Sequence, residues 1–351
     1  MNRNRWIRGI ASACLLALPV LMTGCSLFQG NDSAKQIDPP PAGVENQYMN
    51  NEAAMASVTN ADQTKQMQAT LYFKDPKGFV APITMDLPQT AQIAKEALEY
   101  MVDGGPGQSL LPEGFTALLP KGTKVRGINV DQKLATVDLS GEFAHYDAKD
   151  ERKIVEAVTW TMTGFNSIDK VRLRVNGKDL KEMPVNGFPL DEPLSRSMGI
   201  NIEGSASVNL GQSTPVTLYF LNRNDKQFQY FVPVTRLISY SDDIAKATLQ
   251  ELIKGPEQRS NLTQVMPSSV KILSVNNSDG LVTVNFSGEI LGQNQTVPAE
   301  ALQSVVLSLT ENTGDPKVQI MVDNSVKVNS SDNGNYSLPV TRPAHLNPYM
   351  M

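Results

Sequence analysis

The sequence predicts an α+β fold of two tandem domains, each a small mixed sheet covered on one face by two helices, with an additional N-terminal hairpin. Three observations predict this fold class. Short segments recur at a spacing of about 147 residues. Within each copy, apolar residues alternate between a period of 2 and a period near 3.6. The strand-type segments carry their apolar residues on one face only, so each sheet has one face that needs covering.

The N-terminus has the pattern of a lipoprotein signal. Residues 1–9 carry three arginines, and residues 10–22 form an apolar run. Thirteen helical residues span about 20 Å, which is too short for a hydrocarbon core of about 30 Å. The run ends at Thr23-Gly24-Cys25, which resembles a lipobox, with Met22 where leucine is usual. We therefore expect cleavage between Gly24 and Cys25 and a diacylglyceryl group on the Cys25 thiol.

Charge and cysteine content narrow the classes of partner. The net charge is −5, and loss of the three signal arginines leaves −8, so the exported chain lacks the basic surplus that binds nucleic acid. Cys14 lies in the signal, so only Cys25 remains and no intrachain disulfide can form. Residues 25–66 are polar and predict a lipidated tether after the 1–24 signal.

The remainder of the chain is a duplication. Its repeats predict a first domain at 67–185, a linker at 186–211, a second domain at 212–342 and a tail at 343–351. Each half is long enough to bury a core of its own, so we expect each to fold independently. The recurring segments are Thr70-Leu71-Tyr72-Phe73 and Thr217-Leu218-Tyr219-Phe220, Gly105-Pro106 and Gly255-Pro256, Val137-Asp138-Leu139-Ser140-Gly141-Glu142 and Val284-Asn285-Phe286-Ser287-Gly288-Glu289, and Lys170-Val171 and Lys317-Val318.

Each copy predicts the same order of elements. In the first copy, 69–73 and 79–84 form the hairpin, and 90–102 is an amphipathic helix that ends at Asp103-Gly104-Gly105-Pro106. A second hairpin, a second helix and a closing strand follow, at 125–130 with 133–139, at 150–163 and at 170–175. The core order is therefore helix, strand, strand, helix, strand.

Alternation along two of these strands assigns the sheet faces. One set points to the helices: Ala135, Val137, Leu139, Val171, Leu173 and Val175. Leu134, Thr136, Arg172 and Arg174 must then lie on the opposite face, which we expect to be open and to be a docking surface. In the second copy, Gln319 and Met321 take the places of the two arginines.

The chemistry-bearing residues are few. Asp138, Glu142 and Glu289 could form the paired carboxylates of a glycan hydrolase. The alternative is a structural role for Ser-Gly-Glu in the turn into the second helix, and Asn285 in place of Asp138 favours it. His145 could be a ligand, but the second copy has Gly292 to Asn294 at its place. Trp160 could be a binding residue, but Leu307 takes its place in the second copy, which favours ordinary packing. No metal-ligand spacing, phosphate loop or nucleophile elbow is present, so we expect no catalytic residue, no metal and no cofactor.

Several of these motifs together resemble the GerMN domain. They are a helix ending in Gly-Pro, the segment Leu119 to Thr123, the Val-Asp-Leu-Ser-Gly-Glu strand end, the Thr161 to Thr163 helix and a Lys-Val strand. The second copy departs at Met266-Pro267-Ser268-Ser269. The resemblance implies a fold similar to the ring-building motif of secretion systems. It also implies a sporulation and germination lipoprotein, anchored outside the cell membrane, that works in the space between mother cell and forespore.

The same resemblance implies the partners. They are protein components of the intermembrane sporulation channel, together with copies of the chain itself in a homo-oligomeric ring. The expected function is therefore a non-enzymatic assembly component. The alternatives are an extracytoplasmic ligand-binding or signalling accessory and, more remotely, a cell-wall hydrolase. No nucleic acid is expected as a partner.

Overall fold

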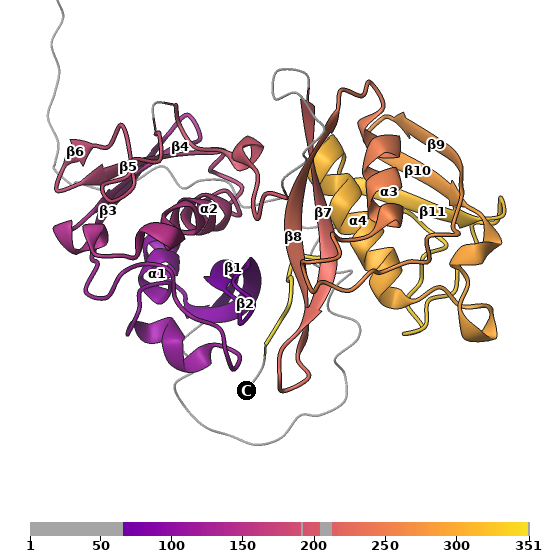
Figure 1. Ribbon diagram of the computed structural model, residues 1–351, viewed down its shortest axis with the longest axis horizontal. Coiled ribbons are helices and arrows are strands. Elements are labelled where there is room, and N and C mark those ends of the chain that lie inside the picture. Colours follow the sequence, from indigo (N-terminus) through magenta and orange to yellow (C-terminus); the bar gives the residue numbers. More distant parts are fainter. Residues whose placement is uncertain (1–65, 191, 204–212, 350–351) are drawn as a thin grey trace, which may run out of the picture. The chain divides into compact units, whose positions relative to one another are not determined.

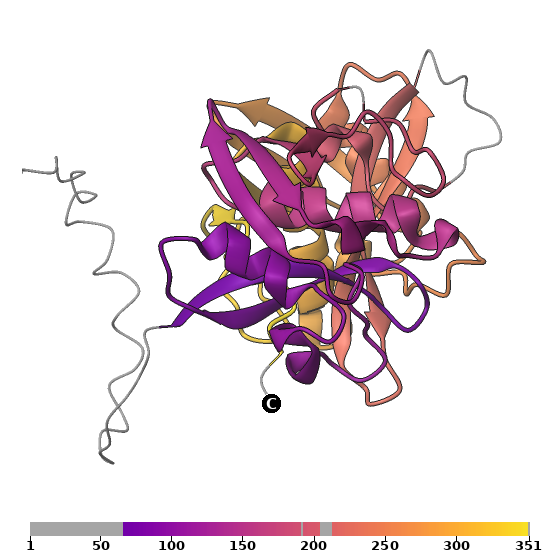
Figure 2. The ribbon, with the colours of Figure 1, turned by 90° about the vertical axis from the view of Figure 1, so that its left-hand side faces the viewer.

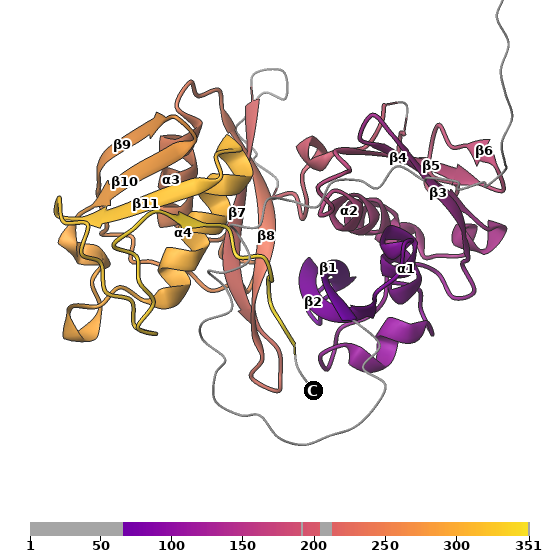
Figure 3. The same cartoon turned by 180° about the vertical axis from the view of Figure 1, so that it is seen from behind.

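The computed structural model describes residues 66–190, 192–203 and 213–349. The predicted signal, the cleavage site at Gly24, the lipidated Cys25 and the tether lie outside these residues. Figure 1 labels the helices and strands, and Figure 3 shows the same chain from behind. Helices in the described part of the chain are all too short or too polar to span a bilayer.

The first copy contains a hairpin, a four-stranded sheet and two helices. Strand β4 pairs antiparallel with β3 and parallel with β5, so the sheet is mixed, in the order β3-β4-β5-β6. Helix α2 packs on the hairpin strand β1 and on β5. The bounds are β1 Gln66–Lys74, β2 Val80–Pro88, α1 Ile93–Tyr100, β3 Val125–Asp131, β4 Leu134–Leu139, α2 Glu151–Met162, β5 Lys170–Val175 and β6 Lys178–Asp179.

The second copy repeats this arrangement. Its sheet has the order β12-β11-β10-β9, with β10 and β11 parallel. The predicted fold class is thus confirmed, although helix α1 starts three residues later than expected. The bounds are β7 Ser213–Arg223, β8 Gln229–Ser239, α3 Ile244–Lys254, β9 Ile272–Ser278, β10 Leu281–Phe286, α4 Ala299–Thr313, β11 Lys317–Val322 and β12 Val340–Thr341.

The two sheets differ on the face that lies away from the helices. In the first copy the residues predicted to be internal are buried, except for the half-buried Val175, and Arg172 on the other face is exposed. In the second copy we expected Gln319 on an equally open face, and this is wrong. Gln319 is 8 % exposed, and its Nε2 donates to the carbonyl oxygens of Ile320 and Tyr336. The segment that contains Tyr336 therefore covers this face.

The hairpins of the two copies pack together. Strands β2 and β8 are in contact, as Figures 1 and 3 show. The buried Asp75 carboxylate accepts hydrogen bonds from the Asn222 side chain at 2.7 Å and the Tyr230 hydroxyl at 2.9 Å. Buried side chains of both copies belong to one hydrophobic cluster. Independent folding of each copy stays a prediction, as do the domain boundaries.

Two asparagines join the hairpins in a reciprocal way. The Asn201 side chain accepts from the Val80 amide and donates to the carbonyls of Val80 and Pro233, each at 2.8 Å. The Asn347 side chain accepts from the Phe231 amide and donates to the carbonyls of Phe231 and Pro82, again at 2.8 Å. Each asparagine thus bridges β2 and β8. Asn201 binds two backbone groups of β2 and one of β8, whereas Asn347 binds two of β8 and one of β2. The copies are therefore related by an approximate twofold axis.

Candidate functional site

The predicted docking residues share one face of the first sheet. Leu134 and Thr136 on β4 and Arg174 on β5 are half-buried, and Arg172 is exposed. The register pairs Leu134 with Lys170 and Thr136 with Arg172, so these side chains are neighbours across adjacent strands. Figure 2 shows this half of the chain facing the viewer. The face thus carries the polar Thr136 and the cationic Arg172 and Arg174 beside Leu134.

The two arginines differ in their surroundings. Arg174 forms an ion pair with Asp179 on β6, and the hydrogen bond from Arg174 lowers the pKa of Asp179. No ion pair is formed by Arg172 among the described residues. Asp138, on the same face, accepts from the Gly177 amide at 2.8 Å and lies 3.4 Å from Arg126 Nε. Arg172 and Lys170 are therefore the exposed cations on these two strands that form no ion pair among the described residues.

The carboxylates considered for hydrolysis have structural partners. The Ser140 hydroxyl accepts from the Lys124 amide, and Ser287 does the same for Lys271. A hydrogen bond from Ser140 lowers the pKa of Glu142, and one from Ser287 lowers the pKa of Glu289. A general acid needs the opposite shift. The Ser-Gly-Glu segments thus act as turns, and the described residues contain no cluster able to hold a metal.

His145 and Trp160 differ in burial. His145 is exposed in the loop before α2, whereas the neighbouring Tyr146 hydroxyl donates to Glu151 at 2.7 Å. Trp160 is fully buried on α2, with the Arg196 guanidinium 4.5 Å from the centre of its ring. A cation over an indole ring is a favourable contact. Trp160 therefore belongs to a polar cluster that was not foreseen.

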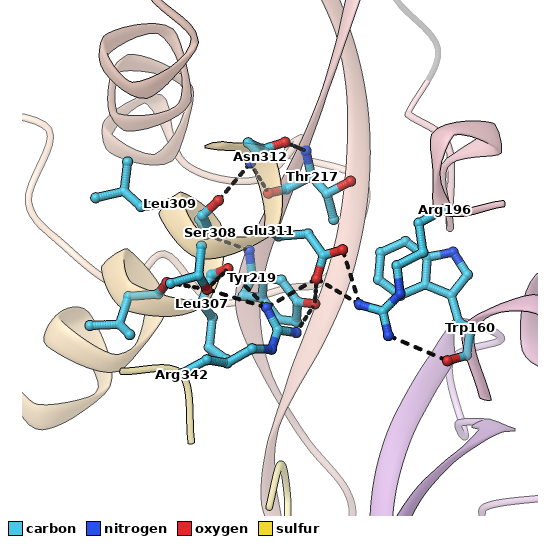
Figure 4. A network of polar contacts seen from close by, with 12 residues as sticks. Trp160, Arg196, Thr217, Tyr219, Leu307, Ser308, Leu309, Glu311, Asn312 and Arg342 are labelled. Atoms are coloured by element: carbon cyan, nitrogen blue, oxygen red, sulfur yellow. Dashed lines mark hydrogen bonds and ion pairs between the residues drawn. The ribbon is translucent and has the colours of Figure 1, made fainter. Parts of the chain in front are cut away.

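This cluster, the Glu311 cluster, consists of Trp160, Arg196, Tyr219, Glu311 and Arg342 (Figure 4). Arg196 Nη1 lies 3.0 and 2.9 Å from the two carboxylate oxygens of Glu311. Arg342 Nη1 lies 3.0 Å from the second oxygen, and the Tyr219 hydroxyl donates to that oxygen at 2.9 Å. Two guanidinium groups from the two copies thus converge on one carboxylate.

Burial and charge oppose each other at Glu311. Its side chain is 9 % exposed, and this burial acts to raise the pKa of its carboxyl. The positive charges of Arg196 and Arg342 outweigh burial and hold the pKa below its ordinary value. Glu311 is therefore ionised at neutral pH, while the two arginines leave one positive charge in excess.

A sequence signal for the cluster exists. Pro193-Leu194-Ser195-Arg196 returns as Pro339-Val340-Thr341-Arg342, and Ile200-Asn201 returns as Leu346-Asn347. The duplication therefore extends into the segments predicted as linker and tail. The repeat there consists only of short matches. With it, both arginines and both asparagines could have been paired from sequence.

Comparisons with known proteins agree with the duplication. The family model Germane, described as sporulation and spore germination, matches residues 70–181 and 217–328. The chain is 40% identical to the spore germination protein GerM of Bacillus subtilis (strain 168), covering 96% of this chain and 97% of that protein. It is also similar to the solved tandem GerMN domains of the sporulation protein GerM from Bacillus subtilis. That similarity has a TM-score of 0.77 and 39% identity, over 82% of this chain and all of that one. With both copies matched and a relative of this identity along nearly the whole chain, the protein belongs to the Germane family of sporulation and spore germination proteins.

Proposed function

We propose that this chain is a non-enzymatic lipoprotein that assembles with other proteins of the mother cell–forespore channel. A diacylglyceryl group on Cys25 would hold it on the extracytoplasmic face of the membrane, since two acyl chains anchor a protein stably. The family membership and the lipobox-like N-terminus support this proposal. The ring-building-motif-like order of elements in both copies supports an assembly role, which includes a homo-oligomeric ring.

The difference between the two sheet faces is the observation that carries the proposal. Both copies have the same fold, yet the face is covered in the second copy, where Gln319 is buried. In the first copy the same face leaves Arg172 exposed, beside the half-buried Thr136. A fold that can cover this face but leaves it open in one copy has a surface available for a partner. We therefore assign partner docking to the β4–β5 face of the first copy.

A binding role also fits the chemistry better than hydrolysis does. Glu142 and Glu289 have lowered pKa values, which favour the ionised form and disfavour proton donation to a glycosidic oxygen. Asp138 is engaged by Gly177 and Arg126. These residues serve the turn that leads to the second helix of each copy.

Arg172→Glu tests the docking surface. The side chain is exposed and its change reverses one charge without removing an ion pair among the described residues. Stability should change by about 0.5 kcal/mol or less. Across an interface, a like-charge contact costs several kcal/mol. We therefore expect a normal melting temperature, a large loss of sporulation efficiency and loss of crosslinked channel proteins.

Lys246→Glu is the matched control, because Lys246 is also exposed and lies on α3 of the second copy. It makes the same charge change away from the proposed surface and should sporulate normally. Normal sporulation and normal crosslinking of the Arg172→Glu variant would contradict the proposal. Equal defects in both variants would show an effect of net charge and would also contradict it.

A further inference from the structure

The two copies differ at the C-terminal ends of their second helices. Helix α4 continues to Thr313, whereas α2 ends at Met162. In the duplication Gly164 takes the place of Glu311, and Phe165 takes the place of Asn312. The first copy therefore lacks one helical turn and the carboxylate and amide side chains on it.

In the second copy, these two side chains complete the outer edge of the hairpin. Asn312 Oδ1 accepts from the Thr217 amide at 2.8 Å, and Asn312 Nδ2 donates to the Thr217 carbonyl at 2.7 Å. Glu311 lies beside them, in contact with Arg196 and Arg342. The edge of β7 and both guanidinium groups are thus satisfied by neighbouring residues of one helix.

In the first copy, the equivalent edge is open at Thr70. The Thr84 amide donates to the Leu346 carbonyl, away from β1, so Thr70 and Thr84 form a non-hydrogen-bonded pair in the β1–β2 ladder. The Thr70 amide and carbonyl therefore point away from β2. Among the residues that the structure describes, none takes the role that Asn312 has at Thr217. Unpaired strand edges of this kind are templates for an added strand.

A cavity of about 410 Å³ lies along this open edge. Thr70 and its neighbours Met67 to Ala69 form one side, and Trp160 and Gly164 contribute from α2 and the residues after it. Both Arg196 and Arg342 also line the cavity, and none of its lining residues is acidic. Their side chains are 28% and 29% exposed, so both remain accessible while they contact Glu311.

We propose that this cavity binds an extended peptide segment of a partner protein that carries a carboxylate. Its backbone would pair with the edge of β1 at Thr70, as in recognition by strand addition. Its carboxylate would lie where the twofold relation places a second Glu311, at the position of Gly164, against Arg342 and Arg196. Arg196 and Arg342 together carry one positive charge more than Glu311 neutralises, and this charge attracts the carboxylate of the peptide. This site is separate from the β4–β5 face and does not rest on the proposed function.

Trp160 provides the signal for a binding test. The chain has two tryptophans, and Trp6 lies in the predicted signal, so the processed chain carries a single indole, Trp160, which lines the cavity. The processed chain is titrated in detergent with three blocked or free-acid peptides. They are Ac-TVTEVT-NH2, its neutral counterpart Ac-TVTQVT-NH2, and Ac-TVTVT-OH with a free C-terminal carboxylate. Sodium acetate alone serves as the control for simple anion binding.

Saturable changes in Trp160 fluorescence are expected for a peptide with a carboxylate, with at least tenfold weaker binding of the neutral peptide. Tighter binding of the glutamate peptide identifies a side-chain carboxylate, and tighter binding of the free acid identifies a chain end. Either outcome supports the proposal. It is overturned if no peptide binds, if the neutral peptide binds equally well, or if acetate alone binds as tightly as the peptides.

Gly164→Glu and Gly164→Gln test the missing carboxylate within the chain. An added Cβ at Gly164 would meet the Thr161 carbonyl oxygen at 3.1 Å, a tight contact that requires a small local shift and that both variants share, so their comparison isolates the effect of charge. Both variants should lose peptide binding because they fill the cavity. The glutamate variant should melt at a higher temperature than the glutamine variant, because only glutamate neutralises the two arginines. Equal melting temperatures, or peptide binding that persists in both folded variants, would contradict the assignment.

Discussion

Replacement of Glu311 by glutamine tests how strongly the Glu311 cluster joins the two copies. Glutamine keeps the length of the side chain and one carbonyl oxygen, so it removes charge and leaves packing nearly unchanged. In the wild type, the carboxylate contacts Arg196, Arg342 and the Tyr219 hydroxyl at 2.9 to 3.0 Å. After the change, the two guanidinium groups face each other without a counter-charge.

The expected loss follows from burial. Breaking a buried ion pair costs about 3–5 kcal/mol when the partner charge stays buried. Arg196 and Arg342 are 28% and 29% exposed, so water can compensate part of their charge, and the cost should fall at the low end. We expect Glu311→Gln to lower the free energy of unfolding by about 3 kcal/mol.

Urea unfolding followed by circular dichroism measures this loss as a lower midpoint. Glu300→Gln is the control, because Glu300 lies in the first turn of the same helix and forms no ion pair among the described residues. Its loss should be limited to the helix-dipole contribution of at most about 1 kcal/mol. Equal midpoints for Glu311→Gln and the control would refute the view that this carboxylate stabilises the contact between the copies.

Three further predictions concern the bridging asparagines, acidity and the anchor. Asn347→Ala should destabilise the chain by about 2–4 kcal/mol, because three backbone hydrogen bonds to Phe231 and Pro82 are lost in a buried position. A loss of less than about 0.5 kcal/mol in the free energy of unfolding, measured by urea unfolding, would contradict this. The pKa of Glu311 is lower in the folded state than in the unfolded state. Its contribution to the free energy of unfolding is therefore complete above the unfolded pKa near 4.5 and is lost as pH falls through the lower folded value. Wild type should therefore lose stability below about pH 4.5 more steeply than Glu311→Gln, and parallel pH profiles would argue against this. Cys25→Ser removes the thiol that accepts the diacylglyceryl group, so the protein should appear in the soluble extracytoplasmic fraction or remain as precursor. Membrane retention of this variant with its signal removed would disprove the lipid anchor.

Local patterns predicted most of the fold. Alternation in β4 and β5 placed Val137 and Leu173 inside and Arg172 outside, because side chains along a strand must point to opposite faces. The parallel pairing of β4 and β5 follows from the helix between them. Duplication made these assignments stronger, since both copies had to obey the same pattern.

Long-range pairing was harder to predict. Nothing in the local pattern of Gln319 shows that Tyr336 covers it, and its polarity suggested exposure. The segments with Arg196 and Arg342 lack helical or strand periodicity, so Arg196 was predicted in the linker and Arg342 as the last residue of the second domain, with no role for either. Their roles depend on contacts with Glu311, which comes 115 residues after Arg196. Such contacts can be inferred from sequence only by aligning the two copies with each other.

Site-specific photocrosslinking in sporulating cells tests the central claim most directly. A benzophenone amino acid at Thr136 lies on the open face of the first sheet, and at Thr283 it occupies the equivalent place in the second. Both side chains are half-buried in the isolated chain. We predict a crosslink to a channel protein from position 136 that disappears with Arg172→Glu, and none from position 283. Absence of a crosslink at position 136, or equal crosslinks at both positions, would contradict partner docking at this face.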